Sequence, residues 1–351
     1  MASIGDPPIA LQRVVAGEEA ALEAFARWLV ASVPTLPPLP LVPVQGGLNN
    51  TTYRLGDVLV KVYGRGTALL TDRARERRLM AHLCAHAAAG TCKALVATFA
   101  GGHIEEWLHG TTLPFAALKA PANLAAIARL LARLHACPLP PEDSPLTAAA
   151  SSTALRAFFD DMSTWAAALP PSLPTPARAP PSPPPTRARL VEEVAWLRGV
   201  PAPSAACVAH HDVAPRAFDI ANFFLECCFV EESESWDWSL EPTREEKLAF
   251  TTAYTDELRS LFDDTTDKEE LLAECEAGWP LVAHLWNVLW AMTTAVAQET
   301  SPAHTQVKGS DEGSVDDVSH GEKVGGGFDY VAYACERWTE YLKQKDLLRS
   351  S

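Results

Sequence analysis

The sequence has little positive charge for its length. Its 351 residues include 29 Lys and Arg against 44 Asp and Glu, which gives a formal net charge of −15. A surface of this sign repels nucleic-acid phosphates and anionic lipid headgroups, so nucleic-acid binders and polybasic membrane-surface proteins are excluded as function classes. Hydrophobic residues make up 48% and charged residues 21%, ordinary values for a globular protein, so wholesale disorder is excluded too.

Long apolar runs are also missing. No run approaches 18 uninterrupted apolar residues, so we expect no stable membrane insertion. The longest apolar region, 279–296, is interrupted by polar residues and predicts a buried helix. The N-terminal segment has neither a basic region nor a long apolar core, so we expect no secretory signal. The eight cysteines are scattered without a CxxC motif, which favours reduced thiols in a cytoplasmic protein over a zinc ribbon or a disulfide scaffold.

Proline, by contrast, is abundant. The chain has 28 prolines, and nine of them fall within residues 170–185. Such a run fits neither a helix interior nor a central strand, so it predicts an exposed linker. Residues 301–327 are rich in Gly, Ser and Asp and predict a second low-complexity insertion without stable structure.

Hydrophobic periodicity divides the chain into two parts. Residues 1–105 predict a small α+β lobe, with helices at 17–33 and 68–88, a turn at 45–56, a buried strand at 57–64, and two strands within 94–110 joined at a Gly-Gly pair. Residues 106–351 predict a larger, mostly helical lobe. Its expected helices cover residues 122–136, 153–167, 190–200, 216–226, 279–296 and 328–347.

Two signals in the first lobe suggest phosphate binding. A glycine turn, Gly46 to Asn50, precedes the strand that carries Lys61, and such a turn can bring backbone N–H groups close to phosphates. A hairpin with an ordinary Gly-Asn turn and a surface lysine explains the same residues. Glu76, on the next expected helix, could orient Lys61 by an ion pair or simply pair with the arginines around it.

Three further signals lie in the second lobe. Asp212, beside His210 and His211, suits a general base, although a metal site or a solvated turn remains open. A polar stripe on the expected helix 216–226 indicates a site wall or a half-exposed amphipathic helix; it consists of Asp219, Asn222 and Glu226. The pair Trp286 and Trp290 indicates either a cation–π surface or plain core.

In this order the segments resemble the choline/ethanolamine kinases, a family that shares the fold of aminoglycoside phosphotransferases and protein kinases. The resemblance covers about Gly46 to Leu347. It is carried by GGLNNTTYRL, DVLVKVYG followed by LLTDRARE, AAIARLLARLHA, RAFDIANFFLE, HLWNVLW and FDYVAYACERWTEYLKQK. It implies an α+β, two-lobed protein-kinase-like fold. It also implies a cytoplasmic enzyme that uses ATP and Mg²⁺ to phosphorylate ethanolamine or choline for phospholipid synthesis, with a homodimer as the expected assembly.

The resemblance also implies roles for single residues. Asp212 would be the catalytic base, with His210 beside it. Lys61, held by Glu76, would contact the phosphates of ATP, and the backbone around Gly46, Gly47, Asn49 and Asn50 would cover them. The segment HIEEWLHG would be the hinge between the lobes, where backbone groups from Glu106 to Leu108 meet adenine. The pocket for the substrate ammonium would be lined by Glu226, Trp286, Trp290 and Tyr330.

One departure from the family pattern concerns the metal ligands. In the family, an asparagine five positions after the catalytic aspartate and a later Asp-Phe/Tyr-Glu segment bind magnesium. Here Ala217 stands at the first position and the later segment is missing. The four residue steps from Asp212 to Arg216 reach about 14 Å at most, too little for two further strands. We therefore expect no family metal ligands and little or no activity, whether the cause is a wrongly joined gene, an inactive splice form or a true pseudokinase.

A second departure concerns substrate choice. Asn287 stands where the family has the first of two tryptophans, and Trp286 comes one residue early, about 100° away around a helix. A full aromatic cage, which a quaternary ammonium group prefers, is thereby weakened. The sequence favours ethanolamine over choline, with a non-catalytic partner of an active family member as the alternative from another functional class.

Overall fold

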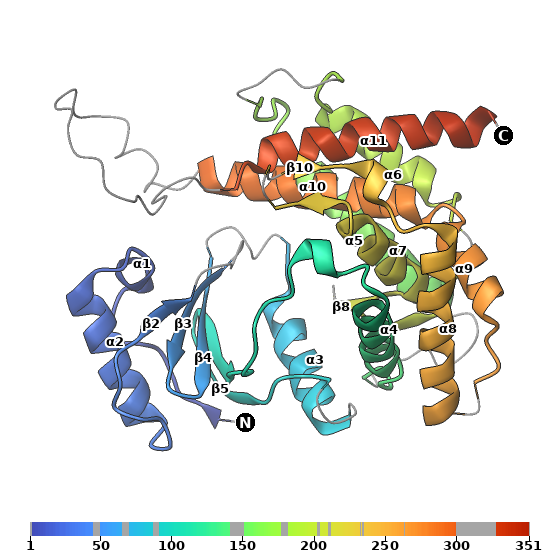
Figure 1. Ribbon diagram of the computed structural model, residues 1–351. Helices are drawn as coiled ribbons and strands as arrows, with labels where there is room; N and C mark the ends of the chain where they lie inside the picture. Colours follow the sequence, from blue (N-terminus) through green and yellow to red (C-terminus); the bar gives the residue numbers. More distant parts are fainter. Residues whose placement is uncertain are drawn as a thin grey trace, which may run out of the picture.

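The first lobe is a six-stranded sheet covered by helices. The computed structural model describes residues 2–44, 50–64, 70–86, 91–140, 151–176, 182–201, 204–209, 212–231, 233, 235–262, 264–299 and 328–350. The strand order is β1-β5-β6-β4-β3-β2, with β1 (Ala2–Ser3), β2 (Val42–Val44), β3 (Asn50–Leu55), β4 (Val58–Tyr63), β5 (Leu95–Phe99) and β6 (Gly102–Glu106). Helices α1 (Leu11–Val15) and α2 (Glu19–Ser32) lie on one side of the sheet, and α3 (Arg73–His86) lies toward the second lobe (Figure 1).

The core of this lobe follows from the alternation of side chains along the strands. Tyr53 and Leu55 on β3, and Val60 and Val62 on β4, point to the same buried face, because residues two apart share a face of a strand. Helix α2 packs its apolar stripe, which includes Phe25, against this face.

The second lobe is mostly helical. It contains α4 (Pro121–His135), α5 (Ser151–Ala168), α6 (Arg187–Leu197), α7 (Arg216–Glu226), α8 (Arg244–Leu261), α9 (Lys268–Glu276), α10 (Trp279–Glu299) and α11 (Tyr330–Ser350). Two short hairpins complete it: β7 (Ala206–Ala209) with β8 (Asp212–Pro215), and β9 (Phe229–Val230) with β10 (Ser235–Trp236). Helix α10 is long and apolar enough to cross a membrane by length and composition, but 72% of that apolar stretch is buried inside this lobe. This confirms the predicted core helix.

The expected elements correspond closely to the observed ones, with one clear error. The predicted helices at 17–33, 122–136, 153–167, 190–200 and 216–226 are all present within a few residues. The turn expected at 45–56 is wrong over residues 50–55, which form β3 and pair with both β2 and β4. The linker within 170–185 carries neither helix nor strand in its described part, as its prolines predict, whereas residues 301–327 lie outside the described residues.

The two lobes meet at a small apolar cluster. Leu79 of α3 packs with Cys137, just after α4, and with Val208 of β7. The His82 ring on α3 also lies 2.7 Å from the backbone oxygen of Pro138. The β7–β8 hairpin therefore lies at the junction of the lobes and packs against α3, the helix that carries Glu76.

Candidate functional site

The segment expected to hold the catalytic base is a tight hairpin. Asp212 opens β8 and pairs with Ala209 of β7, so two residues, His210 and His211, connect the strands. These two histidines and the side chain of Asp212 lie outside the described part of the structure. Strand β8 leads directly into α7, and the Arg216 N–H donates to the Ala205 carbonyl at 2.8 Å. The chain therefore passes from Asp212 through β8 into α7 without an intervening loop.

A buried polar triad joins three helices behind this hairpin. His135 Nδ1 lies 2.8 Å from the Tyr254 hydroxyl, and His135 Nε2 lies 3.0 Å from Asp219 Oδ2. Burial raises the pKa of Tyr254 well above its usual value. The hydroxyl therefore stays protonated and donates to Nδ1, which leaves the Nε2 proton for Asp219. Asp219 is buried between α4, α7 and α8, so it fits neither of the two interpretations left open for its stripe, an open site wall or a half-exposed face.

A buried carboxylate on the central sheet holds the strand lysine. Lys61 Nζ lies 3.6 Å from Glu105 Oε1, and Lys93 donates to the same oxygen at 2.9 Å. His103 Nε2 lies 3.2 Å from the other oxygen. Burial alone would raise the pKa of Glu105, but the His103 bond and the two lysine charges outweigh it and lower that pKa to about 2. Glu105, only 2% exposed, is thus ionised at physiological pH.

The expected pairing of Lys61 with Glu76 is wrong. Glu76 Oε2 instead accepts a bond from Arg73, one turn earlier on α3, at 2.8 Å. Lys61 pairs with His103 across the β4–β6 ladder, so Glu105, two residues along β6, lies on the same face as the lysine. The neighbouring strand therefore supplies the carboxylate that α3 was expected to supply.

Arg73 is a cation at this site that the sequence analysis did not select. Its guanidinium lies 4.1 Å from the centre of the Tyr63 ring and donates to Asn50 Oδ1 at 3.3 Å. The Tyr63 hydroxyl lies 2.9 Å from His103, so Arg73 and the Glu105 cluster are connected. The signal was present in the Asp-Arg pair that begins the helix. Of the residues expected to cover phosphates, Asn50 is described, whereas Gly46, Gly47 and Asn49 lie outside the described residues.

Two backbone N–H groups of the predicted hinge are already hydrogen-bonded within the first lobe. The Glu106 N–H donates to the Ala94 carbonyl at 2.8 Å, and the Trp107 N–H donates to the Asp57 carbonyl at 3.0 Å. These two amides already have acceptors. Leu108 follows them with an exposed side chain, so adenine recognition near Leu108 stays a prediction.

The predicted ammonium pocket already contains a cation of the protein. Arg337 of α11 is fully buried and donates through Nη2 to Glu226 Oε1 at 2.5 Å and through Nε to the Tyr333 hydroxyl at 3.1 Å. Its guanidinium lies 5.1 to 5.2 Å from the ring centres of Trp236, Trp238 and Tyr333. Three aromatic faces and one carboxylate thus surround an internal guanidinium. Neither Arg337 nor Tyr333 was selected from the sequence, although their four-residue spacing on one expected helix was visible there.

The two tryptophans of α10 have different surroundings. Trp290 packs edge-on against Tyr330, with ring centres 5.5 Å apart, and lies 6.0 Å from Tyr333. Trp286 packs instead against Trp165 and Phe218 in the core of the lobe. Its expected place in the pocket is therefore wrong. Trp286 and Trp290 are four residues apart on one helix, so their side chains point in directions that differ by about 40°.

Asn287 completes the wall where the family pattern has a tryptophan. Its Nδ2 donates to Asn222 Oδ1 and to the Ala283 carbonyl, both at 2.9 Å, and its Oδ1 accepts from the Tyr333 hydroxyl at 2.8 Å. The amide is thus fully used inside the protein. A polar chain runs from Asn222 through Asn287, Tyr333 and Arg337 to Glu226, and it fixes the position of that carboxylate.

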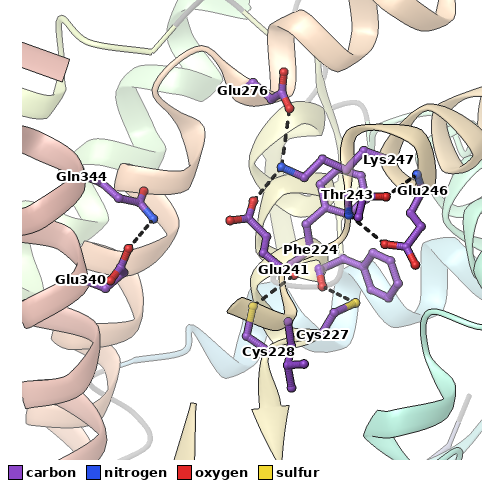
Figure 2. Close-up of polar contacts among 12 residues, drawn as sticks. Phe224, Cys227, Cys228, Glu241, Thr243, Glu246, Lys247, Glu276, Glu340 and Gln344 are labelled. Atoms are coloured by element: carbon purple, nitrogen blue, oxygen red, sulfur yellow. Dashed lines mark hydrogen bonds and ion pairs between the residues drawn. The ribbon is translucent and has the colours of Figure 1, made fainter. Parts of the chain in front are cut away.

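The segment that carries Trp236, at the end of β10, and Trp238 is fixed at its C-terminal end. Figure 2 shows Lys247 between Glu241, at the end of this segment, and Glu276 of α9, with Nζ–Oε1 distances of 2.6 and 3.5 Å. Thr243 and Glu246 form a reciprocal capping box that begins α8 directly after the segment. The aromatic faces are therefore positioned by rigid elements.

Comparisons with known proteins agree on one family. The family model described as choline/ethanolamine kinase matches residues 41–200 and 211–342. The chain belongs to the choline/ethanolamine kinase family. It is 25% identical over 320 residues to an ethanolamine kinase of Drosophila melanogaster and 25% identical over 323 residues to ethanolamine kinase 1 of Homo sapiens, matching 82% of this chain in each case. The matches span 54% of the fly protein and 62% of the human one.

A solved structure supports the fold. The chain superimposes on a Plasmodium vivax ethanolamine kinase with a TM-score of 0.60 at 17% identity, covering 93% of this chain and 89% of the other. The sheet lobe and the helical lobe are thus those of the choline/ethanolamine kinase family. The predicted α+β, two-lobed protein-kinase-like fold is confirmed.

The described residues do not fit the magnesium ion that the resemblance implies. Magnesium in proteins takes carboxylate oxygens together with substrate phosphates. Within the described part of the chain, no three His, Cys, Asp or Glu side chains converge as a metal site requires. Asp219, in the first turn of α7, already accepts the bond from His135 and is buried. The position after the hairpin therefore offers no described ligand set for the ion.

Proposed function

We propose that the chain binds ATP and ethanolamine as an ethanolamine kinase does, for the route to phosphatidylethanolamine, but transfers phosphate very slowly in this form. The observation that carries this proposal is that β8, which begins at Asp212, runs directly into α7 at Arg216. It leaves no chain after Asp212 for a metal-binding loop, while Lys61, Arg73 and Glu226 stay positioned by their partners.

ATP would lie against the cations of the first lobe. Lys61 is held by Glu105, and Arg73 is held by Tyr63 and Asn50, so both positive charges are positioned beside the strands that the glycine segment joins. Positioned cations are what recognition of a triphosphate requires. Choline kinase activity is the alternative within the family.

Ethanolamine fits the second pocket better than choline. A primary ammonium donates N–H bonds to a carboxylate, whereas a trimethylammonium has none to donate and depends on aromatic faces. Three of those faces already surround Arg337, which leaves Trp290 and Tyr330, packed against each other, as the remaining predicted aromatic faces. The pocket therefore supports a small primary ammonium.

A second candidate function is favoured by the same hairpin. A protein that keeps its binding pockets but lacks a metal loop could pair with an active family member, or with a second copy of itself, and regulate it by binding ligand. Such a partner would bind nucleotide without needing magnesium. The cytoplasmic location expected from the sequence stays a prediction.

We expect ATP to raise the melting temperature by several degrees at saturating concentration, by mass action on the folded state. The rise should be the same with Mg²⁺ and with EDTA, because the described residues give the ion no ligand set. The Lys61→Met variant should lose most of the rise. A Lys343→Met variant, which removes an exposed lysine from α11, is the matched control and should keep it. A rise seen only with Mg²⁺ would contradict the proposal.

Calorimetric titration should show ethanolamine binding at least about tenfold more tightly than choline, since each missing aromatic contact is worth roughly 1 kcal/mol. Glu226→Gln should weaken ethanolamine binding, because it removes the charge that faces the ammonium. Equal or tighter binding of choline would overturn the assigned preference. Failure of both amines to bind would overturn the pocket itself.

A further inference from the structure

Two cysteines lie together at one edge of the first lobe. Cys84, near the end of α3, and Cys92, ahead of β5, have their Sγ atoms 3.8 Å apart. Cys84 is exposed and Cys92 is partly exposed, whereas the other six cysteines are buried; those are Cys137, Cys207, Cys227, Cys228, Cys275 and Cys335. All eight are free thiols in the structure. The accessible pair is therefore the place where this protein can react with an oxidant.

The pair is connected to the lysine that would meet ATP. The Cys84 thiol donates to the Lys93 carbonyl at 3.1 Å. The Lys93 ammonium donates to Glu105 Oε1 at 2.9 Å, the same oxygen that lies 3.6 Å from Lys61. A change in the covalent state of Cys84 thus has a short route, through Lys93 and Glu105, to Lys61.

We propose that Cys84 and Cys92 form a reversible disulfide when the protein meets hydrogen peroxide, and that the disulfide weakens nucleotide binding at Lys61. The second part rests on the proposed ATP site, whereas the first does not. The sulfur atoms need to approach by just under 2 Å to reach the S–S bond length of about 2.05 Å, a shift that rotation of these exposed and partly exposed side chains can supply.

The chemistry balances in two steps. The Cys84 thiolate attacks the peroxide oxygen and becomes a sulfenic acid, while the O–O bond breaks and, after protonation, water leaves. The Cys92 sulfur then attacks the sulfenic sulfur, its proton leaves with the hydroxyl group as a second water, and the S–S bond forms. Burial, with Cys84 next to it, raises the pKa of Cys92 to about 11, so the exposed Cys84 reacts first and Cys92 resolves it.

Counting thiols tests the disulfide without reference to ATP. The full chain is treated with hydrogen peroxide, quenched, denatured and titrated with a thiol reagent, and the linked peptides are identified by mass. We expect the count to fall by two, a Cys84–Cys92 peptide to appear, and reduction to restore the full count. Cys84→Ser and Cys92→Ser should abolish the linked peptide, and Cys335→Ser, at a buried thiol on α11, should keep it. An unchanged count, a Cys92–Cys137 link or an overoxidised Cys84 without a link would each overturn the inference.

Nucleotide titration then tests the connection to Lys61. Oxidised protein should bind ATP about threefold or more weakly than reduced protein, the scale of a loosened, partly exposed ion pair. Reduction should restore affinity, and Cys84→Ser protein should not respond to peroxide. A disulfide that forms without changing ATP affinity contradicts the connection. Reduced protein that binds no ATP contradicts the proposed function and this connection, while the thiol count still decides the disulfide.

Discussion

Supplied with ATP, Mg²⁺ and ethanolamine, the purified chain is expected to form phosphoethanolamine at least about a thousandfold more slowly than human ethanolamine kinase 1 under the same conditions. The metal in phosphoryl transfer supplies several kcal/mol of charge stabilisation in the transition state, and each 1.4 kcal/mol is a factor of ten in rate. In this chain β8 pairs with β7 and runs directly into α7, so no loop after Asp212 is available to bring metal ligands to the phosphates.

A matched variant distinguishes slow catalysis by this chain from the activity of a contaminating enzyme. Asp212→Asn keeps the size and the backbone pairing of β8 but removes the expected base. If the residual rate of the original chain equals that of Asp212→Asn, the rate does not come from this site. A rate within tenfold of the human enzyme that falls in Asp212→Asn would show that other groups hold the metal, and the shortened hairpin would not explain the function of this chain.

Restoring the connection offers the complementary measurement. Grafting the loop of the human relative between Asp212 and α7 should raise the rate if the first lobe and the ammonium pocket are intact. It should leave the rate low if they have also diverged. The graft therefore distinguishes the loss of one segment from a general loss of the site.

Much of the fold could be predicted from local patterns. Helices α4, α7 and α10 carry apolar residues at helical spacing over ten or more residues, and the structure places those stripes in the core. Strand β3 was missed because its sequence, NTTYRL, follows Gly-Gly and reads as turn chemistry. These residues form a strand because they pair with β2 and β4, and such pairing depends on the tertiary structure.

Several residues of the site could be predicted from the sequence, but the contacts between them could be predicted less well. Lys61 was found from its strand, but its partner depends on the register of β4 against β6, and register across a long loop cannot be derived from composition. Arg337 lies four residues after Tyr333, yet its other neighbours, Trp236 and Trp238, come from a loop a hundred positions earlier. Long-range pairings of this kind decide which charges are free for ligands.

Arg337→Met is expected to lower the free energy of unfolding by about 3 kcal/mol, because it removes charge-assisted bonds to Glu226 and Tyr333 and the contacts with three aromatic rings. Urea unfolding measures this change. Arg349→Met, at an exposed arginine on the same helix, should change stability by no more than about 0.5 kcal/mol.

The same variant also shows whether the internal guanidinium serves the substrate. Glu226 is 31% exposed, so it can turn toward water once Arg337 is gone, and it then no longer holds its bound orientation. Considered alone, the loss of the Arg337 charge should make the pocket attract a cationic substrate more strongly. Weaker ethanolamine binding in Arg337→Met, partly rescued in Arg337→Lys, is therefore expected only if Arg337 positions Glu226. Tighter binding would instead show that the guanidinium competes with the substrate for that carboxylate.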